Sequence, residues 1–428
     1  MGDIGEPIML EVVCNRGFNK IQQRSDVFTH VHEILEEREE VAMDTVLSIP
    51  VKNVVHVLVC TNVDKYTQRS ALKFNFYVLH DGAAEEETID HGGEAVEIAQ
   101  HWLLPSRELH GLWESLIYEE EIKEGMLSFA ETSMLFARKS VSSKLVACNR
   151  LALFHGPPGT GKTSLCKAIA QKLSIRLNEH YKHFHLFEIN SHSLFSRWFS
   201  ESGKLVQKVF SQVTELLQDR SSLVCLLMDE IESIAYARDK ISSNEPTDSI
   251  RVVNAVLTQL DRVRLFPNVF VLATSNLTDS IDGAFLDRAD FVQYIGYPST
   301  HGIYEIYRMA LEELIAAEII KDEEQQQKKK LCIPSYTAAT NLGRAPCTML
   351  DMLVRVSMLS QGLSGRTLRK IPFLAHALYV KKESDTLLNF LAAMRQAVSK
   401  VRSDKELLGK DRTASEKSSN GSHSVVDL

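Results

Sequence analysis

A single eight-residue stretch restricts the possible folds of this chain more than any other part of it. It reads Gly156-Pro157-Pro158-Gly159-Thr160-Gly161-Lys162-Thr163 and fits the pattern G-x-x-x-x-G-K-[ST]. The glycines let the backbone turn tightly and approach a ligand, because no Cβ intervenes. Backbone N–H groups then point at phosphate oxygens, with Lys162 reaching the β- and γ-phosphates and the Thr163 hydroxyl bound to Mg²⁺. The stretch therefore predicts a site for ATP or ADP with Mg²⁺, and Ser164 extends it into the following helix.

The flanks of this loop have the periodicities that such a site needs. Residues 151–154 (Leu-Ala-Leu-Phe) form a short apolar run, which predicts a buried parallel strand. After the loop, Leu165, Ile169 and Leu173 recur every four residues and mark one face of a helix. The alternative is a glycine-rich turn that binds nothing, and the Lys-Thr pair together with both flanks argues against it.

A second apolar strand is predicted at residues 223–228, and two carboxylates follow it, Asp229 and Glu230. In sites that hydrolyse nucleotides, one such carboxylate holds Mg²⁺, usually through water, and the next polarises the attacking water. We assign these roles to Asp229 and Glu230 in that order. The alternative is an acidic cap on a helix that follows a strand, and it fits less well with a run this apolar downstream of a phosphate loop.

Two further polar residues lie where strands of the expected sheet end or begin. Asn276 closes an apolar run at residues 269–276, at the edge where open parallel sheets bind ligands, and its amide is placed to orient water beside the γ-phosphate. Asn also favours turns, so its position after the carboxylate strand is what supports this role. Arg288 precedes the last strand and is predicted either to reach the nucleotide of a neighbouring subunit or to form a surface salt bridge with Asp287 or Asp290.

Two loops carry candidates for contacts with nucleotide or substrate. Gly365 allows close backbone approach, and Arg366 is placed to contact phosphate from a helical lid. A helix capped by Ser364 with an exposed arginine explains the same residues. Trp198 and Phe199 stand side by side in a stretch rich in Ser and Gly, either as partly buried anchors or as an exposed aromatic paddle.

The order of the apolar patterns divides the chain into four regions. Residues 1–100 form a separate N-terminal α/β domain. In residues 101–298 strands and helices alternate, which predicts a three-layer αβα domain around a parallel sheet. Residues 299–402 are helical and form a C-terminal lid. Residues 403–428 are rich in Ser, Lys and Asp and are expected to be disordered.

The first region shows no pattern of catalytic groups. Strands are predicted at residues 51–60 and 74–79, a helix at residues 27–43 and an acidic loop at residues 81–93. An adaptor-binding or substrate-binding domain is the functional interpretation, and a purely structural cap is the alternative.

Composition narrows the class of protein. The chain has 428 residues and a formal net charge of −8, which argues against a protein that coats nucleic acid. No apolar run approaches the ~20 residues of a membrane-spanning helix. Seven cysteines without a C-x-x-C pair fit reduced thiols in the cytosol or nucleus. His180, His183 and His185 lie close together, but no second cluster gives zinc-like spacing, so a zinc site is not expected.

Taken together, these motifs resemble those of the AAA+ ATPases over roughly residues 105–400. They resemble still more the pachytene checkpoint ATPases, a family also called thyroid hormone receptor interactor thirteen. The first hundred residues match that family only in layout. The segments that carry the resemblance are Ser200-Glu201-Ser202-Gly203-Lys204, Arg251-Val252-Val253-Asn254-Ala255-Val256-Leu257-Thr258-Gln259, Asp287-Arg288-Ala289-Asp290, Gly362-Leu363-Ser364-Gly365-Arg366 and Pro372-Phe373-Leu374-Ala375-His376-Ala377-Leu378.

The resemblance implies a homohexameric ring that hydrolyses ATP and remodels HORMA-domain proteins, helped by a HORMA-fold adaptor. The implied substrates belong to the spindle checkpoint and the meiotic chromosome axis. The implied location is the nucleus and cytoplasm, on chromosomes or kinetochores, with no direct nucleic-acid or membrane partner. A nucleic-acid motor or clamp loader on the same core is the alternative, which the acidic charge balance disfavours. A scaffold that binds ATP without hydrolysing it is a second alternative, and Glu230 argues against it.

The family pattern also implies roles for individual residues. It makes Asn276 sensor one, Arg288 the arginine finger and Arg366 sensor two. This chain has one arginine in the finger segment, where AAA unfoldases commonly have a second. The remaining assignments are Leu116 and Ile117 against adenine, Trp198 and Phe199 in the first pore loop, and a second pore loop within residues 241–249.

Overall fold

The computed structural model describes residues 7–38, 40–61, 63, 66, 70–91, 94–191, 202–232, 247–276, 281, 283–321, 333–341 and 349–420. The chain separates into two compact units. The first is drawn from residues 1–116, 120–156 and 162–295. The second is drawn from residues 296–428 and two short segments, 117–119 and 157–161.

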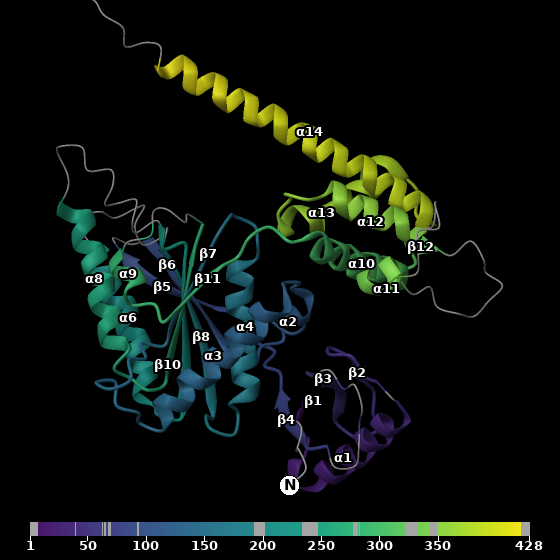
Figure 1. Cartoon of the computed structure of the whole chain (residues 1–428). Helices are drawn as coiled ribbons and strands as arrows, with labels where there is room; N and C mark the ends of the chain where they lie inside the picture. The colour runs from purple at the N-terminus through teal and green to yellow at the C-terminus, as the bar shows by residue number, and fades with distance from the viewer. Residues whose placement is uncertain are drawn as a thin grey trace, which may run out of the picture. The chain divides into compact units, whose positions relative to one another are not determined.

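The N-terminal part of the first unit is a four-stranded sheet in the order β2-β3-β1-β4 (Figure 1). Strand β1 pairs parallel to β4 and antiparallel to β3, and nearly all of its residues are buried. Helix α1 covers one face of this sheet with Val27, Val31 and Leu35. The bounds are β1 Ile8–Cys14, α1 Lys20–Glu37, β2 Val46–Leu47, β3 Val54–Val59 and β4 Leu72–Val78.

The sequence predicted β3 and β4 but missed β1, and it placed helix α1 too late in the chain. The first turns of α1 are polar, so no apolar periodicity marks them. The helix begins there because the Asn19 side chain accepts hydrogen bonds from the backbone N–H groups of Ile21 and Gln22.

The larger sheet of the first unit has seven strands in the order β11-β7-β10-β9-β8-β6-β5. The five strands from β11 to β8 run parallel, which confirms the predicted parallel sheet. Strands β6 and β5 extend one edge as an antiparallel pair. The bounds are β5 Glu85–His91, β6 Glu94–Leu104, β7 Leu151–His155, β8 His183–Asn190, β9 Ser222–Asp229, β10 Val269–Ser275 and β11 Phe291–Tyr294.

Two predictions about this edge were wrong. Residues 81–93 were expected to form a loop, but Glu85–His91 is strand β5. Residues up to 100 were assigned to the N-terminal domain, but β5 and β6 belong to the larger sheet. The run of three glutamates that opens β5 breaks the apolar alternation by which a strand is recognised. An edge strand tolerates such charges, because one of its sides has no neighbouring strand.

Helices cover both faces of the larger sheet, which confirms the predicted three-layer αβα architecture (Figure 1). Helices α6 (Ser202–Gln218) and α8 (Thr247–Val263) share an apolar core with one face of strands β7, β9 and β10. Helices α3 (Glu120–Arg138) and α4 (Lys162–Arg176) lie on the other face, where Phe129 of α3 contacts Phe270 and Phe291. No helix in the described part of the chain has the length and apolar character needed to cross a membrane.

The second unit is a bundle of helices with its own apolar core. Tyr304, Tyr307 and Phe390 are fully buried in it, and the Tyr307 hydroxyl lies 2.8 Å from Ser360 Oγ. The helices are α10 Thr300–Ala316, α11 Tyr336–Asn341, α12 Met349–Leu359, α13 Gly365–Ala375, the π-helix η1 His376–Val380 and α14 Leu387–Asn420.

The expected disordered tail is wrong as far as Asn420, because α14 continues through it. This stretch contains the good helix formers Lys, Glu and Leu, and Lys400 pairs with Asp404 one turn later at 3.3 Å. Residues 421–428 lie outside the described residues.

A buried ion cluster joins the N-terminal sheet to the helix that follows the phosphate loop. Lys172 Nζ of α4 lies 2.6 Å from Glu11 Oε2 on β1 and 2.8 Å from Glu114 Oε1 on α2 (Leu112–Ser115). The Glu11 and Lys172 side chains are only 1% and 5% exposed. Burial alone would lower the pKa of Lys172, but Glu11 and Glu114 outweigh it and raise that pKa above its ordinary value. The lysine therefore stays charged and neutralises two carboxylates.

We expect Lys172→Met to lower the free energy of unfolding by about 3–5 kcal/mol, because it leaves the Glu11 carboxylate buried without its cation. Urea unfolding followed by circular dichroism measures this change. The control is Arg355→Met on α12, where an arginine that is 69% exposed pairs with Asp351 at 2.9 Å. There we expect a change of about 0–1 kcal/mol. Equal changes in the two variants would contradict a special role for the buried cluster.

Candidate nucleotide-binding site

The phosphate loop begins where β7 ends, at a position that only glycine can occupy. Gly156 has φ +142°, and a Cβ placed there would lie 2.2 Å from the backbone oxygen of Ile295. Its N–H donates to the backbone oxygen of Ser275, 3.2 Å away at the end of β10. Lys162 Nζ donates to the Gly156 oxygen at 2.8 Å, so the lysine side chain folds back over the phosphate loop.

The middle of the loop belongs to the second unit, where it meets the start of α13. Gly159 has φ +78°, and a Cβ there would lie 3.0 Å from Ser364 Oγ and 3.3 Å from Arg366 Cβ. The backbone N–H of Arg366 donates to the Gly159 oxygen at 3.0 Å. Ser364 also caps α13, and the Arg366 side chain is exposed, which is what the capped-helix alternative describes. Contact of Arg366 with phosphate stays a prediction. A Cβ at Gly365 would lie 3.6 Å from the Gly159 oxygen, an ordinary van der Waals distance, so the predicted close approach to a ligand at Gly365 stays a prediction.

The residues expected to hold adenine are divided between the two units. Leu116 is buried in the first unit. Ile117 packs against the apolar core of the second unit, beside Gly302 of α10. The next residue, Tyr118, donates its hydroxyl to the Thr160 oxygen of the phosphate loop at 3.1 Å. The sequence analysis did not predict Tyr118 as a site residue. Its position directly after Leu116 and Ile117, which were predicted to contact adenine, could have indicated it.

The two predicted Mg²⁺ ligands lie side by side. Thr163 Oγ1 at the start of α4 donates to Asp229 Oδ1 at the end of β9, at 2.7 Å. The Thr274 hydroxyl, at the end of β10, donates to the same carboxylate oxygen. A hydroxyl and a carboxylate are the oxygen ligands that Mg²⁺ prefers, so these residues fit the metal that a bound nucleotide brings. Thr274 was not predicted, although it stands two residues before Asn276.

Glu230 is held in a defined position by the end of β10. Its φ is +56°, a left-handed conformation uncommon for a residue with a side chain. Its N–H donates to Thr274 Oγ1 at 3.2 Å, and Asn276 Nδ2 lies 3.4 Å from its Oε1. Asn276 therefore lies beside the predicted catalytic carboxylate, and its role of orienting water beside the γ-phosphate stays a prediction.

A third carboxylate, Glu232, completes this cluster and was missed by the sequence analysis. Asn276 Nδ2 donates to Glu232 Oε1 at 2.9 Å, and the residue is 8% exposed. Its other oxygen has no hydrogen-bond partner among the described residues. Burial lowers the pKa of Lys162, and the charges of Glu232, Asp229 and Glu230 oppose that shift.

Arg288 forms a salt bridge, but with neither of the two predicted partners. Its Nε and Nη2 lie 3.0 Å from the two carboxylate oxygens of Asp261 on α8. Asp290 instead accepts from the backbone N–H of Arg150 at 2.6 Å, at the start of β7. The alternative that paired Arg288 with Asp287 or Asp290 was therefore wrong, because it relied on closeness in sequence, whereas the packing of α8 brings Asp261 to Arg288. The arginine-finger role stays a prediction.

The predicted pore-loop residues Trp198 and Phe199 lie outside the described residues. The same holds for residues 241–246 of the second pore loop. Their assignments therefore stay predictions.

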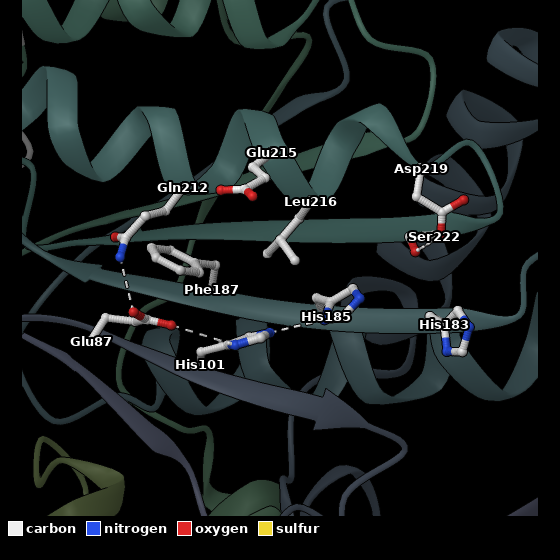
Figure 2. Close-up of a pocket in the computed structure, with 10 residues that line it drawn as sticks. All are labelled: Glu87, His101, His183, His185, Phe187, Gln212, Glu215, Leu216, Asp219 and Ser222. Carbon is white, nitrogen blue, oxygen red and sulfur yellow. Dashed lines mark hydrogen bonds and ion pairs between the residues drawn. The ribbon is translucent and has the colours of Figure 1, made fainter.

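A separate pocket of about 510 Å³ lies between the edge of the larger sheet and α6 (Figure 2). Its polar lining is a chain of contacts. Gln212 Nε2 donates to Glu87 Oε2 at 3.0 Å, the other Glu87 oxygen lies 3.8 Å from His101 Nδ1, and His101 Nε2 lies 2.9 Å from His185 Nδ1. Burial lowers the pKa of His185 to about 4, so its imidazole is neutral near pH 7. Within the described ranges, no group of three or more His, Cys, Asp or Glu is placed to hold a metal ion.

Comparison with known proteins identifies two family patterns in the chain. The model of the ATPase family associated with various cellular activities (AAA) matches residues 152–297. The model of the TRIP13-like AAA+ ATPase lid C-terminal domain matches residues 299–402. The first contains the two apolar strands, the carboxylates and the arginine discussed above, and the second contains Ser364, Gly365 and Arg366.

Known proteins that match most of this chain, in sequence or in structure, belong to the same family as these two models indicate. The pachytene checkpoint protein 2 homolog of Danio rerio is 47% identical over 398 residues, which covers 90% of this chain and 92% of that protein. The solved structure of C. elegans PCH-2 matches with a TM-score of 0.78 at 34% identity, over 93% of this chain and all of that one. A chain from the structure of the E. coli MS115-1 HORMA:CdnC:Trip13 complex shares the fold, with a TM-score of 0.51 at 17% identity over 70% of this chain and 94% of that one. Identity of this extent confirms the resemblance seen in the sequence, and the chain belongs to the pachytene checkpoint protein 2 family of AAA+ ATPases.

Proposed function

We propose that this chain forms a homohexameric ring whose ATP hydrolysis converts HORMA-domain proteins from one conformation to another. The observation that carries this proposal is the contact of Thr163 with Asp229 and of Asn276 with Glu230, in a chain that matches the AAA model and the TRIP13-like lid model. A ring that only binds ATP needs no carboxylate beside the γ-phosphate, yet Thr274 holds the backbone N–H of Glu230 and Asn276 contacts its carboxylate.

The chemistry of the nucleotide site follows from these contacts. Mg²⁺ bound with ATP neutralises phosphate charge, and Thr163 and Asp229 are the residues that would hold it. Lys162 binds the β- and γ-phosphates. Burial lowers the pKa of Lys162, and the charges of the surrounding carboxylates oppose that shift. Glu230 accepts a proton from the attacking water, and Asn276 fixes the direction of its carboxylate.

HORMA proteins are the proposed partners because a distant structural relative was solved as a complex of HORMA, CdnC and Trip13. We assign the N-terminal sheet, β1 to β4, to binding the substrate with a HORMA-fold adaptor. The ion pair between Lys172 and Glu11 connects that domain to the helix that begins at Lys162. We further propose action in the spindle checkpoint and on meiotic chromosome axes, in the nucleus and cytoplasm.

Trp198→Ala tests whether the ring grips its substrate with an aromatic loop. A flat aromatic side chain can hold an extended chain by apolar contact and stacking, without reading its sequence. We expect normal ATP binding, normal basal ATPase activity and an unchanged melting temperature, with loss of HORMA conversion. All four are measured on one preparation.

The matched control is Trp113→Ala, which removes a tryptophan that is 7% exposed. It is expected to lose roughly 3–5 kcal/mol of stability and to lose ATPase activity alongside. A Trp198→Ala protein that behaves like this control, or that converts substrate normally, contradicts the pore-loop assignment. ATPase activity stimulated by DNA and not by HORMA proteins would favour the nucleic-acid motor instead.

A further inference from the structure

Arg288 is fixed in the subunit that carries it by contacts from two separate elements. Its Nε lies 3.0 Å from Asp261 Oδ1 and its Nη2 lies 3.0 Å from Asp261 Oδ2, so two parallel hydrogen bonds form on one edge of the guanidinium. Its Nη1 donates to the backbone oxygen of Ala284 at 2.6 Å, on α9 (Gly283–Leu286). A bidentate pair of this kind sets the plane of the guanidinium as well as its position.

Asp261 is itself anchored to the sheet. Arg264 Nη2 lies 3.4 Å from Asp261 Oδ1, and Arg264 Nη1 donates to Asn149 Oδ1 at 3.0 Å. The backbone oxygen of Arg264 accepts from Arg150, whose Nε also donates to the Val269 oxygen at 3.2 Å. The carboxylate therefore belongs to a chain of contacts that reaches the start of β7 and β10. These two strands lead, at their other ends, to the phosphate loop and to Asn276.

Stability does not account for this arrangement. The side chains of Arg288 and Asp261 are 26% and 34% exposed, and ion pairs this open to water contribute little to the free energy of unfolding. Orientation does account for it. A free arginine side chain loses rotamer entropy when it is ordered, and a side chain that is ordered beforehand avoids that loss in the transition state.

We propose that Asp261 is a positioning residue, which orients Arg288 so that it meets the nucleotide of the neighbouring subunit. This inference rests on the proposed arginine-finger role of Arg288. Asp261 acts through Arg288 and does not itself contact the reacting phosphate. Asp261 thus acts on the nucleotide site of the neighbouring subunit, although Asp261 and Arg288 both belong to the same subunit.

Asp261→Asn is the first test, because the amide keeps the shape and removes the charge. We expect kcat for ATP to fall between about 10- and 100-fold, the loss typical of a misplaced reacting group, with the KM for ATP and the melting temperature unchanged. Asp261→Glu keeps the carboxylate and should recover part of the activity. Asp287→Asn is the matched control, since it removes the same charge beside Arg288 in sequence. The Asp287 side chain is exposed and makes no hydrogen bond or ion pair with another described residue.

Mixing of subunits supplies a readout that a merely structural role would not reproduce. Asp261→Asn subunits keep an intact nucleotide site, so Lys162→Ala neighbours, which keep an oriented Arg288, should restore turnover. Arg288→Ala neighbours should not restore it, because neither subunit then offers an oriented finger. A residue that supports only its own nucleotide site would show the reverse, with rescue by Arg288→Ala and none by Lys162→Ala.

The outcomes separate failure of this inference from failure of the role it rests on. Normal turnover of Arg288→Ala alone overturns the arginine finger and this inference with it. Loss of turnover in Arg288→Ala with unchanged turnover in Asp261→Asn overturns only the positioning role. Higher turnover in Asp261→Asn also overturns it, because Asp261 would then restrain the arginine and not present it.

Discussion

Arg288→Ala is expected to bind ATP nearly as well as the unchanged protein and to lose turnover by about 10³–10⁵-fold, the range attributed to an arginine finger. The nucleotide site of the same subunit keeps Lys162, Thr163 and Asp229, so binding is preserved. The loss arises in the neighbouring site, where no guanidinium meets the charge that develops on the transferring phosphoryl group. ATP titration and steady-state ATPase assays measure the two quantities separately.

Complementation tests whether Arg288 acts across the subunit boundary. Mixing Arg288→Ala with Lys162→Ala subunits should restore part of the activity, because one contributes an intact site and the other an intact finger. Arg355→Ala is the control, an exposed arginine in an ion pair on α12 of the lid, and its turnover should stay normal. If Arg288→Ala turns over ATP normally, its bidentate pair with Asp261 is only a local contact between α8 and the segment before β11.

Glu230→Gln is expected to slow hydrolysis by about 10²–10⁴-fold, the usual contribution of a general base. The amide keeps the size of the side chain but does not take up a proton at neutral pH. The direct hydrogen bond between Thr163 and Asp229 is untouched, so ATP and Mg²⁺ should still bind. ATP-bound rings and their HORMA complexes should therefore accumulate, and a pull-down with a HORMA protein measures them.

Glu232→Gln is the matched control for this variant, since it removes the same charge two residues away and also contacts Asn276. Its effect should be smaller, because Glu232 bears on the attacking water only through the Asn276 amide. Near-normal hydrolysis in Glu230→Gln contradicts the assignment of Glu230. An equal or larger loss in Glu232→Gln would move the role of general base to that residue.

Much of the nucleotide site could be predicted from the sequence, because its parts are encoded locally. The phosphate loop needs glycine at positions such as Gly156, where the backbone is left-handed and a Cβ would strike Ile295. The parallel strands β7, β9 and β10 are buried on both faces, so each shows as a continuous apolar run. Residues that directly follow such strands must meet at one edge of the sheet, which brought Asp229 and Asn276 into one site.

Contacts between distant parts of the chain were decided by the tertiary structure alone. Asp261 and Lys172 sit on helices whose sequences do not say which carboxylate or guanidinium faces them. The alternative for Arg288 therefore named the wrong carboxylates, and the link between Lys172 and Glu11 was not predicted at all. Edge strand β5 was missed for a related reason. Its charged residues predict a loop when only local periodicity is considered, but pairing with β6 makes them a strand. A motif specifies backbone conformation over a few residues, whereas a side-chain pair depends on how whole helices and strands pack, which no short pattern records.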